Sequence, residues 1–154
     1  MSKKICIIIV TVLLVLIASY SSIVIANNIV AKNLEQDLLD CAIPDEIHII
    51  DSVSIAKKTS GNGNGMQWHG ALLVKSELTK DELTAYYENL IIDDNLCISV
   101  SAQDSPLVFE QYKYHFKYYD PIDFYYCVML SKNSISGLET SFFEKILNFD
   151  VRGH

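Results

Sequence analysis

The first 26 residues carry the strongest hydrophobic pattern in the chain. Residues 5–26, which begin with Ile5 and end with Ala26, contain no charge, proline or glycine. At 1.5 Å per residue they would form a helix of about 33 Å, enough to cross a hydrocarbon core of about 30 Å. We therefore predict a transmembrane anchor whose partner is the lipid bilayer. The alternative is a signal peptide cleaved after Ala26, although such peptides usually have an apolar region of only about 7–15 residues.

The charges beside this run predict its orientation. Lys3 and Lys4 precede it, and the residues that follow are mixed in charge and mostly acidic. A positively charged flank usually stays in the cytoplasm. We therefore expect a single-pass protein of the cell membrane, with its N-terminus in the cytoplasm and its C-terminal domain outside.

A second helical pattern continues from the anchor. Apolar residues recur at helical spacing until Pro44, and the residue before a proline disfavours helix. We place the domain boundary there. The chain then divides into a cytoplasmic tip and anchor (1–26), a helical stalk (27–43) and an extracytoplasmic domain (44–154).

The domain opens with two strand patterns and a helix. Residues 47–55 alternate, with one expected apolar face made of Ile47, Ile49, Asp51, Val53 and Ile55. A glycine-asparagine run separates them from a second strand at 66–75, because such steps supply the positive φ angles of hairpin turns. The Thr-x-x-Glu box of Thr79 and Glu82 predicts a helix that begins after Thr79, stapled by Leu78 and Leu83.

Three further strand patterns complete the domain. They cover residues 96–101, 112–118 and 124–130, whereas residues 138–151 fit either a helix or a last strand. The pattern predicts an α+β fold, with a mainly antiparallel sheet and one firm helix packed on a face.

Charge and cysteine content exclude several classes of function. All 19 acidic but only 10 of the 12 basic residues follow residue 26, which gives that part a formal net charge of −9. This charge disfavours nucleic acid and anionic lipid headgroups as ligands. Cys41, Cys97 and Cys127 form no Cys-x-x-Cys pair, so we expect no structural metal. Cys97 and Cys127 either form one bridge or remain free thiols.

The sequence contains no catalytic signature. His48, His69, His115 and His154 are not spaced as metal ligands, and no Gly-x-Ser-x-Gly elbow is present. We interpret them as surface histidines, with His69 on an outward strand face. No catalytic residue, metal ligand or cofactor is therefore expected.

Two segments remain as candidates for binding. The first is the turn made of Gly61, Asn62, Gly63, Asn64 and Gly65. Its glycines serve a hairpin loop, a partner-binding loop or, least well, a phosphate cradle. The second is the C-terminal cluster of Asp150, Arg152 and His154. These side chains share a face if the chain is extended, either in an ordered final strand or in a site.

The same two segments carry a resemblance. The run from Gly61 to Met66, together with the Asp-x-Arg-Gly-His end, resembles small, uncharacterised, membrane-anchored proteins of Gram-positive bacteria. The resemblance covers about residues 44–154 and implies an anchored, exported domain without a known activity.

These observations favour a non-enzymatic accessory factor that binds an envelope protein or peptide outside the membrane. Two alternatives stay open. One is an envelope hydrolase with a noncanonical site, and the other is a secreted domain released after Ala26.

Overall fold

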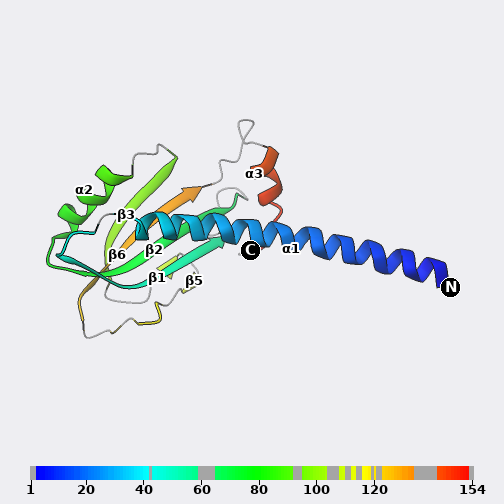
Figure 1. The fold of residues 1–154 in the computed structure, drawn as a ribbon, viewed down its shortest axis with the longest axis horizontal. Helices are drawn as coiled ribbons and strands as arrows, with labels where there is room; N and C mark the ends of the chain where they lie inside the picture. The colour runs from blue at the N-terminus through cyan, green and yellow to red at the C-terminus, as the bar shows by residue number, and fades with distance from the viewer. Residues whose placement is uncertain are drawn as a thin grey trace.

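A long N-terminal helix lies across a four-stranded sheet and projects beyond it (Figure 1). The computed structural model describes residues 3–41, 43–58, 65–91, 95–103, 108–109, 112–113, 116–118, 120, 123–133 and 142–152. An N-terminal apolar helix, an antiparallel sheet and further helices confirm the predicted α+β class.

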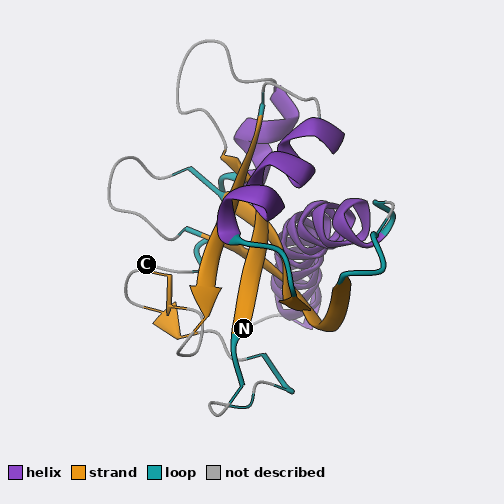
Figure 2. Cartoon of the chain, turned by 90° about the vertical axis from the view of Figure 1, so that its left-hand side faces the viewer, coloured by secondary structure: helices purple, strands orange, loops and turns teal. Residues whose placement is uncertain are grey.

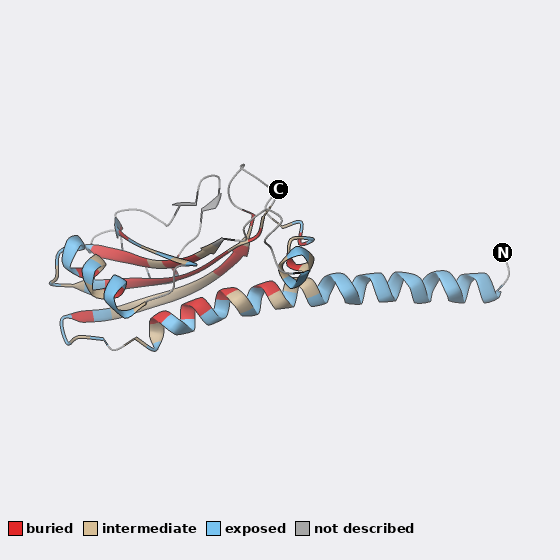
Figure 3. Cartoon of the chain, turned by 90° about the horizontal axis from the view of Figure 1, so that it is seen from above, coloured by how far each residue is buried: buried red, intermediate tan, exposed pale blue. Residues whose placement is uncertain are grey.

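Helix α1 (Lys3–Leu39) has two halves with different surroundings. Every position from Lys3 to Ser22 is exposed, and buried positions begin where α1 meets the sheet (Figure 3). Among the described residues α1 is the helix that could cross a membrane, judged by length and composition. Its second half is buried at the positions Asn27, Ala31, Leu34, Glu35 and Leu38.

This burial differs from the predicted separate stalk. The residues of α1 after Ala26 are helical, as expected, but they pack on the sheet and belong to its hydrophobic core. The helix therefore enters the domain without a break near residue 27.

The sheet contains β1 (Ile47–Lys57), β2 (Gln67–Ser76), β6 (Tyr125–Asn133) and β3 (Leu96–Gln103), in the order β1-β2-β6-β3. All three pairings are antiparallel. One end of the sheet holds Lys57, Gln67 and Asn133, which follow one another in register. The opposite end holds the start of β6, where Tyr125 pairs with Gln103.

Helices α1 and α2 (Lys80–Leu90) cover one face of the sheet (Figure 2). Trp68, Leu72 and Val74 of β2 point into this layer. Gly70 lies between them because α1 crosses there, and a Cβ at this position would collide with the backbone of Leu34 and Glu35. The other face has its own smaller core, which consists of Ala71, Leu73, Phe116, Tyr125 and Cys127.

A β-bulge changes the predicted faces of β1. The register shifts between Ile49 and Asp51, so Ile49 is paired with Val74 while Asp51 is paired with Leu73. One extra residue reverses the faces of all later positions. Ser52, Ser54 and Ala56 therefore face α1, and the single apolar face predicted for 47–55 is wrong.

Helix α2 follows its sequence signals closely. The Thr79 side chain accepts from the Glu82 amide at 3.3 Å, and the Glu82 carboxylate accepts from the Thr79 amide at 2.8 Å. This reciprocal capping confirms the predicted start.

The later predictions fare less evenly. Of the strand expected at 112–118, the structure has β5 (Tyr112–Lys113), which pairs with β4 (Val108–Phe109), and a turn at Lys117 and Tyr118. The ambiguous 138–151 region contains a short helix, α3 (Phe142–Leu147). An ordered final strand was one alternative for the C-terminus. Residues 150–152 form no strand, and Arg152 lies in a turn.

Candidate functional site

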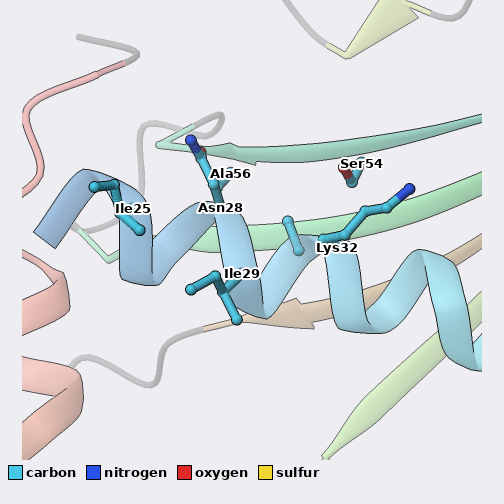
Figure 4. Close-up of a pocket in the computed structure, with 7 residues that line it drawn as sticks. Ile25, Asn28, Ile29, Lys32, Ser54 and Ala56 are labelled. Carbon is cyan, nitrogen blue, oxygen red and sulfur yellow. The ribbon is translucent and has the colours of Figure 1, made fainter. Parts of the chain in front are cut away.

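A groove of about 510 Å³ lies between α1 and the edge strand β1 (Figure 4). Its α1 side consists of Ile25, Asn28, Ile29, Ala31 and Lys32, and its β1 side of Ser54 and Ala56. The α1 residues share a face because they recur at helical spacing. The groove is open because the bulge presents two small side chains, Ser54 and Ala56, opposite the helix.

An ion pair between Glu35 and Lys32 lies beside this groove. Glu35 is buried and accepts from the Ser52 hydroxyl at 2.5 Å, and it pairs with the Lys32 ammonium at 2.8 Å. Burial raises the pKa of Glu35, but hydrogen bonds with Lys32, Ser52 and Ser54 outweigh it and hold this pKa below its usual value. Lys32 keeps 59% of its side chain exposed, so a ligand can reach its cation.

Strand β1 also offers its backbone. Within the described part of the chain, β1 pairs with β2 on one side and lies at the edge of the sheet. Edge strands present unpaired N–H and C=O groups that can pair with another strand. An apolar groove beside such an edge can bind an extended segment through its backbone and its side chains.

The predicted C-terminal cluster is part of a buried polar network. The Asp150 carboxylate is buried and pairs with the Arg152 guanidinium at 2.7 Å. The side-chain amide of buried Asn27 donates to Asp150 at 2.9 Å and to the Leu147 carbonyl at 3.1 Å, while its oxygen accepts from the Trp68 indole at 2.9 Å. His154 lies outside the described residues.

This network fastens the C-terminal segment, residues 142–152, to α1. Arg152 also donates to the Asn28 side chain at 2.9 Å and to the Val24 carbonyl at 3.5 Å. Burial raises the pKa of Asp150, but its hydrogen bonds with Arg152 and Asn27 hold the pKa below the usual value. The Asp150–Arg152 pair thus has a structural role here, whatever it binds in addition.

The predicted glycine-rich loop connects β1 to β2. The hairpin register, with Lys57 opposite Gln67, fits the expected turn. Gly61, Asn62, Gly63 and Asn64 lie outside the described residues, and Gly65 begins the next described stretch. The next amide, of Met66, donates to the Asn148 side chain at 2.7 Å. Binding by this loop stays a prediction.

His69 is buried, which corrects the prediction of an outward-facing side chain. Only 5% of the residue is exposed, and its Nδ1 lies 2.8 Å from the Ser131 hydroxyl on the neighbouring strand. Burial lowers the pKa of His69 to about 4. The imidazole is therefore neutral at pH 7 and a weak base. His48 is exposed as predicted, and His115 lies outside the described residues.

Two questions left by the sequence concern a metal centre and a bridge between Cys97 and Cys127. They contain no cluster of three or more histidine, cysteine, aspartate or glutamate side chains that could hold a metal ion. Cys97 is an exposed free thiol, and Cys127 is a buried one whose pKa burial raises to about 12.

The sequence did not reveal the groove. Ile25, Ile29 and Lys32 lie at helical spacing, so the helix side was readable in principle. The strand side of the groove exists because the bulge at Ile50 turns Ser54 and Ala56 toward α1. The regular alternation of residues 47–55 gave no sign of this bulge.

No family model, curated protein or solved structure matches this chain. The resemblance to anchored Gram-positive proteins therefore stays a prediction.

Proposed function

We propose that this protein is a membrane-anchored, extracytoplasmic domain that binds an extended peptide segment of an envelope protein. The observation that carries the proposal is the groove of about 510 Å³ alongside the edge strand β1. The peptide would add a strand to β1 and place apolar side chains against Ile29 and Ala56. Lys32, at the far end of α1's groove face, would meet a polar or acidic group of the ligand.

Two features support anchoring: the exposed apolar half of α1, and the hydrogen bonds that join the domain to α1 near residue 26. Cleavage after Ala26 would place a charged amino group on Asn27, which is fully buried. It would also remove Val24, whose carbonyl accepts from Arg152. An uncleaved anchor avoids both losses, and Lys3 and Lys4 favour a cytoplasmic N-terminus.

The location is testable with the native cysteines. A membrane-impermeant maleimide added to intact cells should label the exposed thiol of Cys97. Cys97→Ser is the matched control, and the difference in labelling between the two chains belongs to Cys97 alone. Labelling that appears only after lysis would place the domain in the cytoplasm, and a soluble form that begins at Asn27 would show a cleaved signal.

Peptide binding is testable with random linear peptides displayed on phage and selected against the full chain in lipid nanodiscs. Selected peptides should slow amide hydrogen exchange in β1, and Ile29→Lys should abolish their binding. Ile29 is 53% exposed, so this change should leave folding intact. Leu90→Lys, at an exposed position of α2, is the control and should bind normally. Binding that survives Ile29→Lys would exclude the groove.

The hydrolase alternative has one structural observation in its favour, the contact between His69 and Ser131. Turnover of a wall-derived peptide or glycan, lost on Ser131→Ala, would support it. Both residues are buried and the pKa of His69 is low, so the geometry favours binding.

A further inference from the structure

Large apolar side chains are unusually exposed in the C-terminal segment. Phe142 is 80% exposed, Phe149 69%, Val151 61% and Phe143 59%. Four such residues within ten positions are costly in water, and clustered exposed apolar residues mark a surface that another apolar phase covers.

The fold places this segment beside the point where α1 leaves the domain (Figures 1 and 3). The hydrogen bonds of Asn27 to Leu147 and Asp150, and of Arg152 to Val24 and Asn28, fix it there. The segment that carries the exposed apolar side chains therefore lies beside the end of the exposed apolar run of α1.

The length of α1 sets the depth of this segment. If α1 spans a hydrocarbon core of about 30 Å starting near Ile5, the core ends about 20 residues later, near Ile25. Residues fastened to Val24 and Asn28 must then lie in the headgroup region, because no linker separates the domain from the helix.

Charge is also segregated along the sheet. Basic residues gather at the end near the C-terminal segment, where the Lys58 amide donates to the Arg152 carbonyl at 3.2 Å. They are Lys57, Lys58, Lys132, Lys145 and Arg152. At the opposite end, by Ile47 and Ser76, lie the acidic residues Asp45, Glu46, Glu77, Asp81 and Asp123, together with two cations, Lys80 and the Lys75 that pairs with Asp123. Glu144 and Asp150 are the acidic residues described near the basic end, and Asp150 is paired with Arg152.

We infer that the C-terminal segment is a bilayer-binding surface that seats the domain on anionic phospholipid. Phe142, Phe143, Phe149 and Val151 enter the interface between acyl chains and headgroups. The exposed Lys145 and the half-buried Lys57 and Lys132 face lipid phosphates, whereas Lys58 is buried and Arg152 is paired with Asp150. The inference rests on the proposed anchoring by α1. The inference adds that one side of the domain always faces the membrane. A domain on a flexible stalk would instead change its orientation freely.

The experiment uses the full chain in vesicles of phosphatidylcholine and phosphatidylglycerol, with lipids brominated at known depths as quenchers. Tryptophan replaces Phe142 or Phe149 in separate variants. Phe124→Trp is the matched control, since Phe124 is 59% exposed and precedes Tyr125 at the opposite end of the sheet. The wild-type chain, with buried Trp68, supplies the background.

The emission of Phe142→Trp and Phe149→Trp should shift to the blue and lose intensity with shallow bromines, while Phe124→Trp stays unchanged. Emission of all three like that of Phe124→Trp would overturn the inference. A blue shift without quenching, dependent on the protein-to-lipid ratio, would also overturn it and assign the surface to a second copy of this chain.

A fourth variant separates this result from failure of the anchor. Leu14→Trp, in the middle of the exposed apolar run, should be quenched by deep bromines if α1 spans the bilayer. Quenching of Leu14→Trp without quenching at Phe142 and Phe149 rejects only the seating surface. Absence of quenching at Leu14 rejects the anchor itself.

Discussion

Two buried polar side chains show how single residues shape the stability of this domain. His69 lies in strand β2 and Tyr87 in helix α2, and both side chains are buried. Each carries a polar group that burial penalises, and each penalty is measurable.

For His69 we predict a loss of stability between about pH 6.5 and pH 4. Its pKa is lowered from 6.5 to about 4, so the unfolded chain binds a proton in this range and the folded chain does not. The contribution of the neutral His69 to the free energy of unfolding is fully present above pH 6.5. The free energy of unfolding falls by about 3 kcal/mol as the pH drops to about 4. Urea unfolding of the detergent-solubilised chain, followed by Trp68 fluorescence, measures this. His69→Asn removes the titration and should flatten the profile, and a slope that persists in this variant would contradict the assignment.

For Tyr87 we predict that replacement by phenylalanine stabilises the domain. The ring is fully buried, and its hydroxyl has no hydrogen-bond partner among the described residues. An unsatisfied buried hydroxyl costs about 1–3 kcal/mol, so Tyr87→Phe should raise the free energy of unfolding by about 1 kcal/mol. Tyr86→Phe, at the half-buried neighbouring position, should change it little. A lower stability of Tyr87→Phe would show that the hydroxyl is satisfied in solution.

At the scale of elements, α2 is defined by its first turn. Thr79 and Glu82 satisfy each other's backbone amides, and Leu83 and Tyr87 bury its inner face. The helix is short, so its start contributes a large share of its stability.

We predict that Thr79→Ala lowers the free energy of unfolding by about 1 kcal/mol, the usual cost of losing an N-cap. Hydrogen exchange of the α2 amides and urea unfolding measure the effect. Thr84→Ala is a matched change within the same helix, where alanine has the higher helix propensity, so it should be neutral or stabilising. Equal effects of the two changes would mean that the cap has no special role.

At the scale of the whole molecule, one network joins the anchor helix, the sheet and the C-terminal segment. Asn27, Trp68, Asp150 and Arg152 belong to three different parts of the chain. The orientation of the domain relative to α1 therefore depends on residues at both ends of the chain.

We predict that Arg152→Ala weakens this connection. Asp150 would remain buried without its cation, which should cost about 2–3 kcal/mol because Arg152 is partly exposed. Faster hydrogen exchange in residues 147–150 and a lower urea midpoint measure the loss. Arg152→Lys keeps the charge but not the forked geometry and should give an intermediate result. Unchanged exchange in Arg152→Ala would refute the structural role of the pair.

The sequence by itself determined the parts of this protein that depend on neighbours in the chain. The apolar run, the capping box at Thr79 and the strand alternation all act within a few residues, so they predicted a long helix, α2 and an antiparallel α+β fold. These patterns predict helices and strands well because the interactions behind them join residues close together in the chain.

Only the tertiary structure decided which faces and ends come together. Asn27 and Asp150 are 123 positions apart, and His69 and Ser131 are 62 apart, so no local pattern records their contacts. One bulge residue in β1 reversed the strand's later side chains and opened the groove. The antiparallel register collected basic residues at the end of the sheet nearest the anchor, although the domain is acidic as a whole. Composition gives the sum of the charges, and only the packing of distant segments decides where each sign lies.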